Sequence, residues 1–175
     1  MLLLFFIVMI ESKGGPVYVQ KRVGRGGREF NIFKIRTMYI NSDKHGELTI
    51  GKNDRRITKM GSFLRKFKID ELPQLINILL GDMSFVGPRP EVIKYVKMYN
   101  SEQQKVLSVR PGLTDFASLH YYDENELLSK YKDPEQAYIH IIFPHKLKLN
   151  LEYIEKRNFS LDIKIIFKTL FRRLK

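Results

Sequence analysis

The chain has 175 residues, the size of one domain that can bury a substantial core. It contains no cysteine, which excludes disulfides, thiolate metal sites and a cysteine nucleophile. Lysine and arginine number 31 against 19 aspartate and glutamate, and the resulting net charge of +12 favours an anionic partner such as nucleic acid, an acidic lipid surface or a phosphorylated substrate.

The first ten residues, Met1 to Ile10, are uncharged and apolar. As a helix they would be only ~15 Å long, about half of the ~30 Å hydrocarbon core, so they cannot span a bilayer. No basic n-region precedes them, and a secretory signal is not expected. Two interpretations remain, a buried core segment or a segment that dips into one leaflet.

Residues Val17 to Ile35 place β-branched and aromatic side chains on both sides of a Gly-Arg-Gly-Gly turn at 24–27, which predicts a β-hairpin. The glycine spacing matches neither the P-loop nor the dinucleotide pattern, so a turn is favoured over a phosphate loop. Residues 41–53 are polar, contain two glycines and predict a mobile loop.

Apolar residues recur at three- and four-residue steps from Arg56 to Phe67 and predict a helix. A second helix is expected to begin at Asp70 to Pro73 and to end at Gly81. The two prolines in Phe85 to Pro90 exclude a helix and a central strand there. A further helix is expected over Glu91 to Ser108, before Arg110-Pro111-Gly112.

The tail from Ser160 predicts an amphipathic helix with an apolar face and several basic side chains. A helix docked on the core and a helix on an anionic membrane surface fit this pattern about equally well. The four histidines, at positions 45, 120, 140 and 145, lack metal-ligand spacing on a shared helix face and are expected at the surface or in packing roles.

The most informative stretch for chemistry contains the adjacent carboxylates Asp70 and Glu71, flanked by cations. One carboxylate can attack phosphorus while the other holds a divalent metal that neutralises phosphate oxygens. An isolated Asp-Glu pair is more often an acidic first turn that stabilises the helix dipole. Arg65 can return to the same pocket, and a rigid Pro-Arg-Pro can aim Arg89 at a phosphate. An ordinary aspartate, with a pKa of about 3.9, needs no general base to attack.

These motifs resemble the bacterial sugar transferases, also called monotopic phosphoglycosyl transferases, which act on undecaprenyl phosphate. The resemblance covers most of the chain, and its most specific part is Asp-Glu-Leu-Pro-Gln followed by Gly-Pro-Arg-Pro. The matching residues are Gly15-Pro16, Gln20, Arg22-Val23-Gly24, Phe30, Lys34, Arg36-Thr37-Met38, Leu64-Arg65, Asp70 to Gln74, Gly81 to Ser84, Gly87 to Pro90 and Arg110 to Thr114.

The resemblance implies an α+β fold, a mostly helical monotopic membrane-associated domain with a small β-hairpin and amphipathic surface helices. Residues 1–13 would form a partial, apparently truncated re-entrant membrane helix, in which the upstream part of the family's helix would be absent. Residues 14–175 would form the catalytic domain at the cytoplasmic face of the bacterial inner membrane.

In the reaction that the resemblance implies, Asp70 attacks the sugar-linked phosphorus of a UDP-sugar, releases UMP and forms an aspartyl phosphosugar. Glu71 would hold Mg²⁺, and a polyprenyl phosphate such as undecaprenyl phosphate would then attack the intermediate. The substrate-binding residues would be Arg65, Pro88, Arg89, Pro90 and Arg110. Tyr122 replaces an arginine that contacts the nucleotide in many members, so nucleotide contacts there are not carried over.

Two other classes of function are compatible with parts of the sequence. A nucleic-acid-binding protein is disfavoured because the cations are not gathered on one helix and no named binding motif occurs. An inactive membrane scaffold would retain the fold without turnover, and UMP release would separate it from an enzyme. The expected partners are therefore a UDP-sugar, a polyprenyl phosphate and the cytoplasmic leaflet, without nucleic acid, and a homodimer is one option for assembly.

Overall fold

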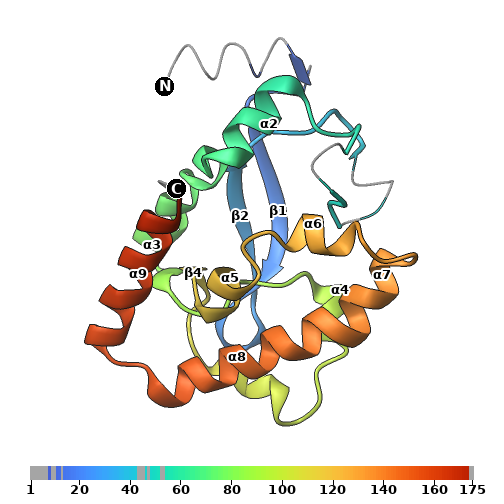
Figure 1. Cartoon of the computed structure of the whole chain (residues 1–175). Coiled ribbons are helices and arrows are strands. Elements are labelled where there is room, and N and C mark those ends of the chain that lie inside the picture. The colour runs from blue at the N-terminus through green and yellow to red at the C-terminus, as the bar shows by residue number, and fades with distance from the viewer. Residues whose placement is uncertain are drawn as a thin grey trace.

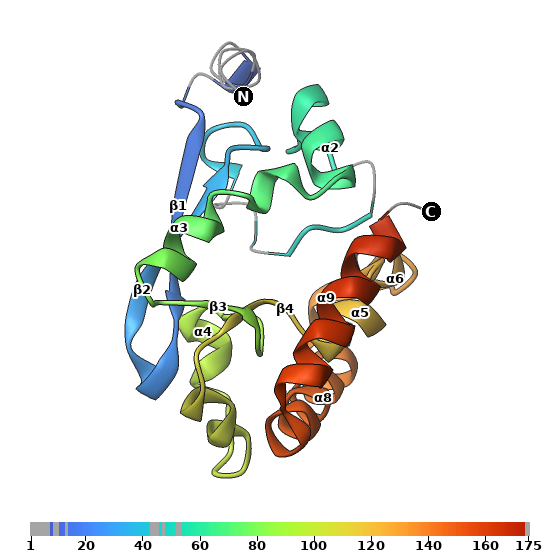
Figure 2. The ribbon, with the colours of Figure 1, turned by 90° about the vertical axis from the view of Figure 1, so that its left-hand side faces the viewer.

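The computed structural model describes residues 14–42, 46, 48–51 and 54–173, together with Val8, Glu11 and Ser12. The fold is α+β, as expected, with a small antiparallel hairpin at one edge of the molecule and helices to one side of it (Figures 1 and 2). Among the described residues, no helix has both the length and the apolar character needed to cross a membrane. The loop predicted at 41–53 lies partly outside the described residues.

The predicted hairpin is confirmed, with strand β1 (Val17–Val23) pairing antiparallel with β2 (Glu29–Ile35). The turn between them, η1 (Arg25–Gly27), has φ values of 69° at Gly26 and 76° at Gly27. Only glycine adopts this left-handed backbone at little cost, which explains the glycine pair without a ligand.

The first predicted helix is α2 (Lys59–Lys66), and the second is α3 (Gln74–Leu79). Thr58 caps α2 by accepting from the amide of Gly61 at 2.9 Å. The second helix begins later than predicted, because residues 69–71 form a separate 3₁₀ turn, η3 (Ile69–Glu71). Asp70 and Glu71 therefore precede α3 and do not lie in its first turn.

A second sheet consists of two short parallel strands, β3 (Ser84–Val86) and β4 (Gly112–Thr114). The single helix predicted over 91–108 is wrong, because the chain forms α4 (Ile93–Val96), an irregular stretch and the 3₁₀ segment η4 (Gln103–Ser108). Asn100 and Gln103 exchange side-chain to backbone hydrogen bonds of 2.9 and 3.0 Å. This reciprocal cap starts a new helical segment and so interrupts the predicted one.

The C-terminal half is helical and was largely not predicted. Its elements are α5 (Phe116–His120), α6 (Glu124–Leu128), α7 (Pro134–Ala137), the π-helical segment η5 (Tyr138–Ile142), α8 (Phe143–Lys156) and α9 (Phe159–Arg173). The π segment lies directly before α8, whose second residue, Pro144, has no N–H to continue the α-helical ladder. The amphipathic tail helix was predicted and is confirmed as α9.

Three clusters of buried side chains hold these elements together. The largest gathers α4, η4, α6, η5 and α8 around Tyr95, Tyr138 and Phe143. A second joins Val8, Ile35 and Leu64. Val8 thus packs in the core, whereas most of the segment 1–13 lies outside the described residues and its membrane role stays a prediction.

The third cluster docks one face of α9 on the domain through Ile165, Tyr153 and Val86. The opposite face of α9 is exposed. Helices α3 and α9 both lie on the left-hand side of the molecule in Figure 1, and Figure 2, which views that side, shows α3 at the left, α9 at the right and β3 between them. The sequence was compatible with a helix docked on the core and with a helix exposed at the surface. In the structure, one face of α9 is docked and the opposite face is exposed.

Candidate active site

The carboxylates Asp70 and Glu71 lie on a sharp turn that follows α2. Lys68, two residues after the end of α2, has φ 55° and ψ 24°, a left-handed conformation that is uncommon for a residue with a side chain. The amide of Glu71 then donates to the carbonyl of Lys68 at 3.2 Å. This turn directs both carboxylates inward, where Asp70 is 7% and Glu71 5% exposed.

Glu71 forms an ion pair with the guanidinium of Arg89. Burial alone would raise the pKa of Glu71, but the charges of Arg89, Lys68 and Lys34 outweigh burial and hold that pKa well below its usual range. The charge of Glu71 in turn raises the pKa of Arg89. Glu71 is therefore ionised, and the structure brings together two residues that lie eighteen positions apart.

The pKa of Asp70 is shifted in the opposite direction. Burial raises its pKa, and the negative charge of Glu71 raises it further against the opposing charges of Lys34, Lys68 and Arg65. Its Oδ1 atom is buried and has no hydrogen-bond partner in the described part of the chain. The ordinary pKa assumed from the sequence therefore does not hold. An unsatisfied buried carboxylate oxygen is costly, and such groups occur where a ligand or a reaction uses them.

Lys34 is a site residue that sequence reasoning missed, although it stands in one of the matching motifs. It lies on β2, and burial together with the positive charge of Arg89 lowers its pKa to about 7. Asn77 fixes β2 beside the dyad, since its side chain accepts from the amide of Phe33 at 3.1 Å and donates to the carbonyl of Asn31 at 2.8 Å. In the sequence, Lys34 could have been noticed as a positively charged residue between the apolar residues of a predicted strand.

Arg65 projects from the last turn of α2 into the same region. Its Nε donates to Thr37 Oγ1 at 2.8 Å and its Nη1 donates to Thr49 Oγ1 at 3.1 Å. Burial lowers the pKa of Arg65, while the charge of Asp70 raises it. Arg65 therefore lies close enough to the dyad to supply positive charge, and two threonines hold it in place.

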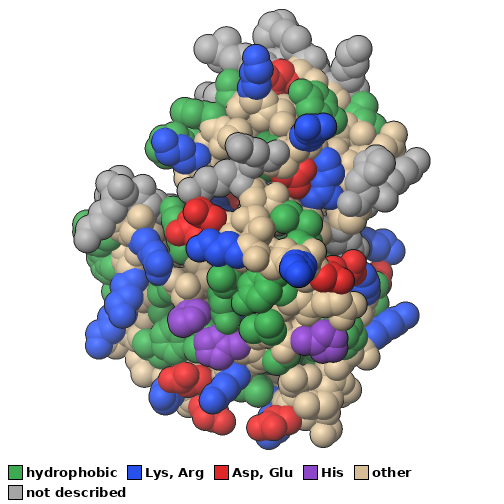
Figure 3. Space-filling view, turned by 45° about the vertical axis from the view of Figure 1, so that its right-hand side comes forward, with side chains coloured by type: hydrophobic (Ala, Val, Ile, Leu, Met, Phe, Trp, Pro, Cys, Tyr) green, Lys and Arg blue, Asp and Glu red, His purple; other side chains and the backbone are tan. Residues whose placement is uncertain are grey.

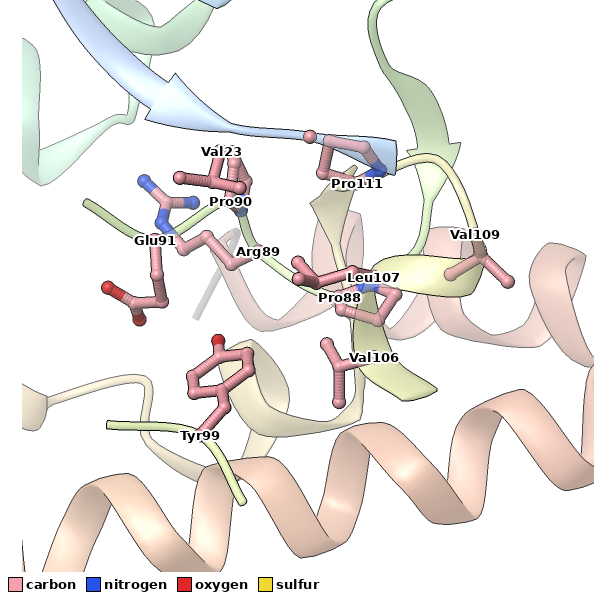
Figure 4. Close-up of a pocket in the computed structure, with 11 residues that line it drawn as sticks. Val23, Pro88, Arg89, Pro90, Glu91, Tyr99, Val106, Leu107, Val109 and Pro111 are labelled. Carbon is pink, nitrogen blue, oxygen red and sulfur yellow. The ribbon is translucent and has the colours of Figure 1, made fainter. Parts of the chain in front are cut away.

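The Pro-Arg-Pro segment runs beside a small pocket (Figure 4). Pro88 and Pro90 line it together with Val106 and Pro111, and the hydroxyl of Tyr99 points into it. Arg22 donates to the carbonyl of Pro90 at 3.3 Å, which fixes the segment from the hairpin side. Pro88 and Pro90 therefore restrict the backbone on either side of Arg89.

Arg110, which the resemblance placed among the substrate-binding residues, is exposed and precedes β4. Its carbonyl oxygen packs against Gly87, where a methyl group would lie only 2.6 Å away. The structure therefore assigns the backbone of Arg110 a role in packing the Gly-Pro-Arg-Pro loop, and a substrate contact by its guanidinium stays a prediction.

The residues present fit a bound Mg²⁺. The described part of the chain contains no cluster of three or more histidine, aspartate or glutamate side chains that could enclose a metal. Mg²⁺ usually needs fewer protein ligands than that, because it is held by one or two carboxylates, waters and the phosphates of a substrate. The unpartnered Oδ1 of Asp70 and the ionised Glu71 beside it offer such a donor set.

The described histidines lie outside this site, on the face shown in Figure 3. His145 Nδ1 lies 2.7 Å from the hydroxyl of Tyr121, and His120 packs edge-on against both rings. Tyr122 lies under the guanidinium of Arg172, 5.1 Å from the ring centroid. The packing role expected for His120 and His145 is confirmed, and His45 lies outside the described residues.

Comparison with known proteins assigns the sequence to a family. The model of the bacterial sugar transferase family matches residues 1–175. The chain belongs to the bacterial sugar transferases. EpsL of Bacillus subtilis (strain 168), an uncharacterized sugar transferase, is 35% identical over 171 residues, which cover 97% of this chain and 76% of EpsL.

Two longer relatives carry more specific names. The UDP-N-acetylgalactosamine-undecaprenyl-phosphate N-acetylgalactosaminephosphotransferase of Aeromonas hydrophila is 36% identical over 94% of this chain. The UDP-glucose:undecaprenyl-phosphate glucose-1-phosphate transferase of Xanthomonas campestris pv. campestris is 39% identical over 93% of it. The chain spans 36% and 32% of the lengths of these sugar transferases.

Proposed function

We propose that the chain transfers a sugar 1-phosphate from a UDP-sugar to undecaprenyl phosphate and releases UMP, as the priming step of cell-surface polysaccharide or glycoconjugate synthesis. The observation that carries this proposal is the buried Asp70, whose Oδ1 lacks a hydrogen-bond partner in the described chain and which lies beside cations. A carboxylate so placed is available to attack, and the cations can accept the charge of a diphosphate.

In the first half-reaction, an oxygen of Asp70 attacks the phosphorus that carries the sugar. The bond from this phosphorus to the bridging oxygen breaks, its electron pair leaves with UMP, and an aspartyl phosphosugar remains. Arg89 and Lys34 neutralise the phosphate oxygens. Glu71 would hold a bound Mg²⁺, whose charge would supply further neutralisation of the phosphate oxygens.

In the second half-reaction, a phosphate oxygen of the lipid attacks the same phosphorus, and the bond to Asp70 breaks to restore its carboxylate. The order of the steps has an electrostatic reason. Two unit charges ~4 Å apart repel by about 4 kcal/mol at an effective dielectric constant of 20. Release of UMP before the second phosphate binds lowers that repulsion, so ping-pong kinetics are expected.

We further propose that the domain acts at the cytoplasmic face of the inner membrane. Large apolar side chains are exposed on α3, β3 and α9, which lie on one side of the molecule (Figure 2). The most exposed, counting Leu80 at the C-cap of α3, are Leu79 (87%), Phe159 (81%), Leu80 (66%), Phe171 (61%), Phe85 (54%) and Phe167 (53%). Lys164 and Lys168 are exposed on α9 beside these side chains and suit anionic headgroups.

The test of the reaction is release of UMP from a panel of UDP-sugars in the presence of Mg²⁺ and undecaprenyl phosphate. We expect release with at least one donor and its loss in the Asp70→Asn variant. The inactive scaffold considered above would release no UMP with any donor.

A further inference from the structure

The loop that carries Arg89 is held along its length by residues 112–115. The amide of Gly112 donates to the carbonyl of Pro88 at 3.0 Å, and the amide of Gly87 donates to the carbonyl of Thr114 at 3.0 Å. A methyl group on Gly112 would lie 2.1 Å from the nitrogen of Gly87, so the two segments are in backbone contact. Residue 115 is the next position along this contact.

Asp115 is fully buried, with 0% exposure. Its Oδ2 accepts from the backbone amide of Arg89 at 3.1 Å, and its Oδ1 accepts from the amide of Ser118 at 2.6 Å at the start of α5. The charge of Glu71 raises the pKa of Arg89 most, and the charge of Asp115 adds to this effect. The side chain thus serves as a helix cap and also contacts the backbone of a site residue.

We propose that Asp115 is a positioning residue for Arg89: its carboxylate fixes the Arg89 backbone so that the guanidinium stays on Glu71, beside Asp70. A carboxylate suits both contacts because each oxygen accepts one amide, and charge-assisted hydrogen bonds are roughly twice as strong as neutral ones. An asparagine side chain has only one oxygen, so it can accept a hydrogen bond from just one of the two amides. The proposal rests on the proposed function only where turnover is the readout.

The informative variant is Asp115→Ser. Serine caps a helix about as well as aspartate, so the contact to the amide of Ser118 is retained. Its side chain is one bond shorter and carries no charge, so the contact to Arg89 is lost. The matched control is Asp133→Ser, because Asp133 caps α7 by accepting from the amide of Gln136 at 3.0 Å and is exposed.

Hydrogen exchange measured by mass spectrometry reads the contact directly and needs no substrate. Residues 87–91 are Gly-Pro-Arg-Pro-Glu, and the prolines have no amide, so a peptide over this segment reports on Gly87, Arg89 and Glu91. We expect Asp115→Ser to accelerate exchange of one amide in this peptide at least tenfold. Asp133→Ser should leave the peptide unchanged.

Turnover is measured on the same proteins. Asp115→Ser should lower kcat for UMP release at least tenfold, with a smaller change in KM for the nucleotide sugar, while Asp133→Ser retains wild-type kcat. Unchanged exchange in Asp115→Ser overturns the proposal, as does accelerated exchange with wild-type kcat. If Asp115→Ser does not fold, Asp115→Asn is judged by the same two criteria. A wild-type chain without turnover contradicts the proposed function, while exchange still decides whether Asp115 holds Arg89.

Discussion

Asp70 and Glu71 are neighbours in sequence with opposite electrostatic surroundings. Glu71 is paired with Arg89, whereas Asp70 is buried beside the negative charge of Glu71 with an unpartnered oxygen. One carboxylate therefore stabilises the folded site, and the other is held at a cost in stability that the proposed nucleophilic role would explain. This difference distinguishes the pair from an acidic first turn, in which both carboxylates would be stabilised by the helix.

Asp70→Asn should remove activity and raise stability. The amide lacks the anionic oxygen that attacks phosphorus, so UMP release should fall by at least a hundredfold. Removing a buried charge beside Glu71 should stabilise the fold by about 1 kcal/mol, a rise in Tm of roughly 2–4 °C. UMP assays and thermal unfolding measure the two effects. A variant that kept more than a tenth of the activity, or that lost stability, would contradict this view of Asp70.

Glu71→Gln should act in the opposite direction on stability. Loss of one partner of a mostly buried ion pair leaves Arg89 without its counter-charge, and we expect about 1–3 kcal/mol of destabilisation. The control is Glu29→Gln, which removes an exposed ion pair with Lys21 and should change stability by less than about 0.5 kcal/mol. Urea denaturation compares them, and equal midpoints would show that the Glu71 pair contributes nothing.

The helix α2 positions Arg65 through a close backbone approach. A methyl group at Gly61 would lie 2.0 Å from the carbonyl oxygen of Thr37, whose side chain accepts the hydrogen bond from Arg65. The same contact explains why a glycine is retained inside a helix, where it costs about 1 kcal/mol relative to alanine. Helix propensity and packing therefore make opposite predictions for this position.

Gly61→Ala should destabilise the protein, because a clash of about 1–3 kcal/mol outweighs the gain of about 1 kcal/mol in helix propensity. Ser62→Ala changes the exposed neighbour on the same helix and should be neutral or slightly stabilising. Thermal unfolding of both variants decides between the two effects. A higher Tm for Gly61→Ala would show that α2 does not pack on residue 37 as closely as described.

The exposed side of α9 can be tested separately from its docked side. Replacing Leu79 and Phe167 together by serine should lower binding to vesicles of anionic phospholipid at least tenfold without loss of fold, because both side chains are exposed. Ile141→Ser is the control, since Ile141 is 51% exposed on η5. Sedimentation with vesicles measures binding, and equal losses in both proteins would contradict a membrane-binding side formed by α3, β3 and α9.

The residue types of the candidate site were easier to predict from the sequence than the way in which distant segments pack around it. Asp70, Glu71 and Arg89 stood in contiguous motifs whose residue types indicate phosphoryl chemistry. Lys34 was missed because its approach depends on Asn77, which joins α3 to β2 through two long-range hydrogen bonds. The break at Asn100 was missed because it depends on a reciprocal side-chain cap between Asn100 and Gln103, which starts a new helical segment.

The pairing of Arg89 with Glu71 was also not predicted, although both residues were assigned to the site. The sequence suggested separate roles, a metal ligand and a phosphate contact, and only the turn at Lys68 and the loop before α4 bring the two charges together. Local motifs predicted which residue types gather at the candidate site. Their mutual distances depend on contacts between segments far apart in sequence.

The nucleophilic role of Asp70 is tested most directly by the intact mass of the protein after incubation with a productive UDP-sugar and Mg²⁺ in the absence of lipid acceptor. The account predicts a covalent gain of one phosphosugar, located on Asp70 by fragmentation, absent from Asp70→Asn and removed when undecaprenyl phosphate is added. An unmodified wild-type protein, combined with intersecting double-reciprocal plots for the two substrates, would show direct transfer in a ternary complex and would contradict Asp70 as the nucleophile.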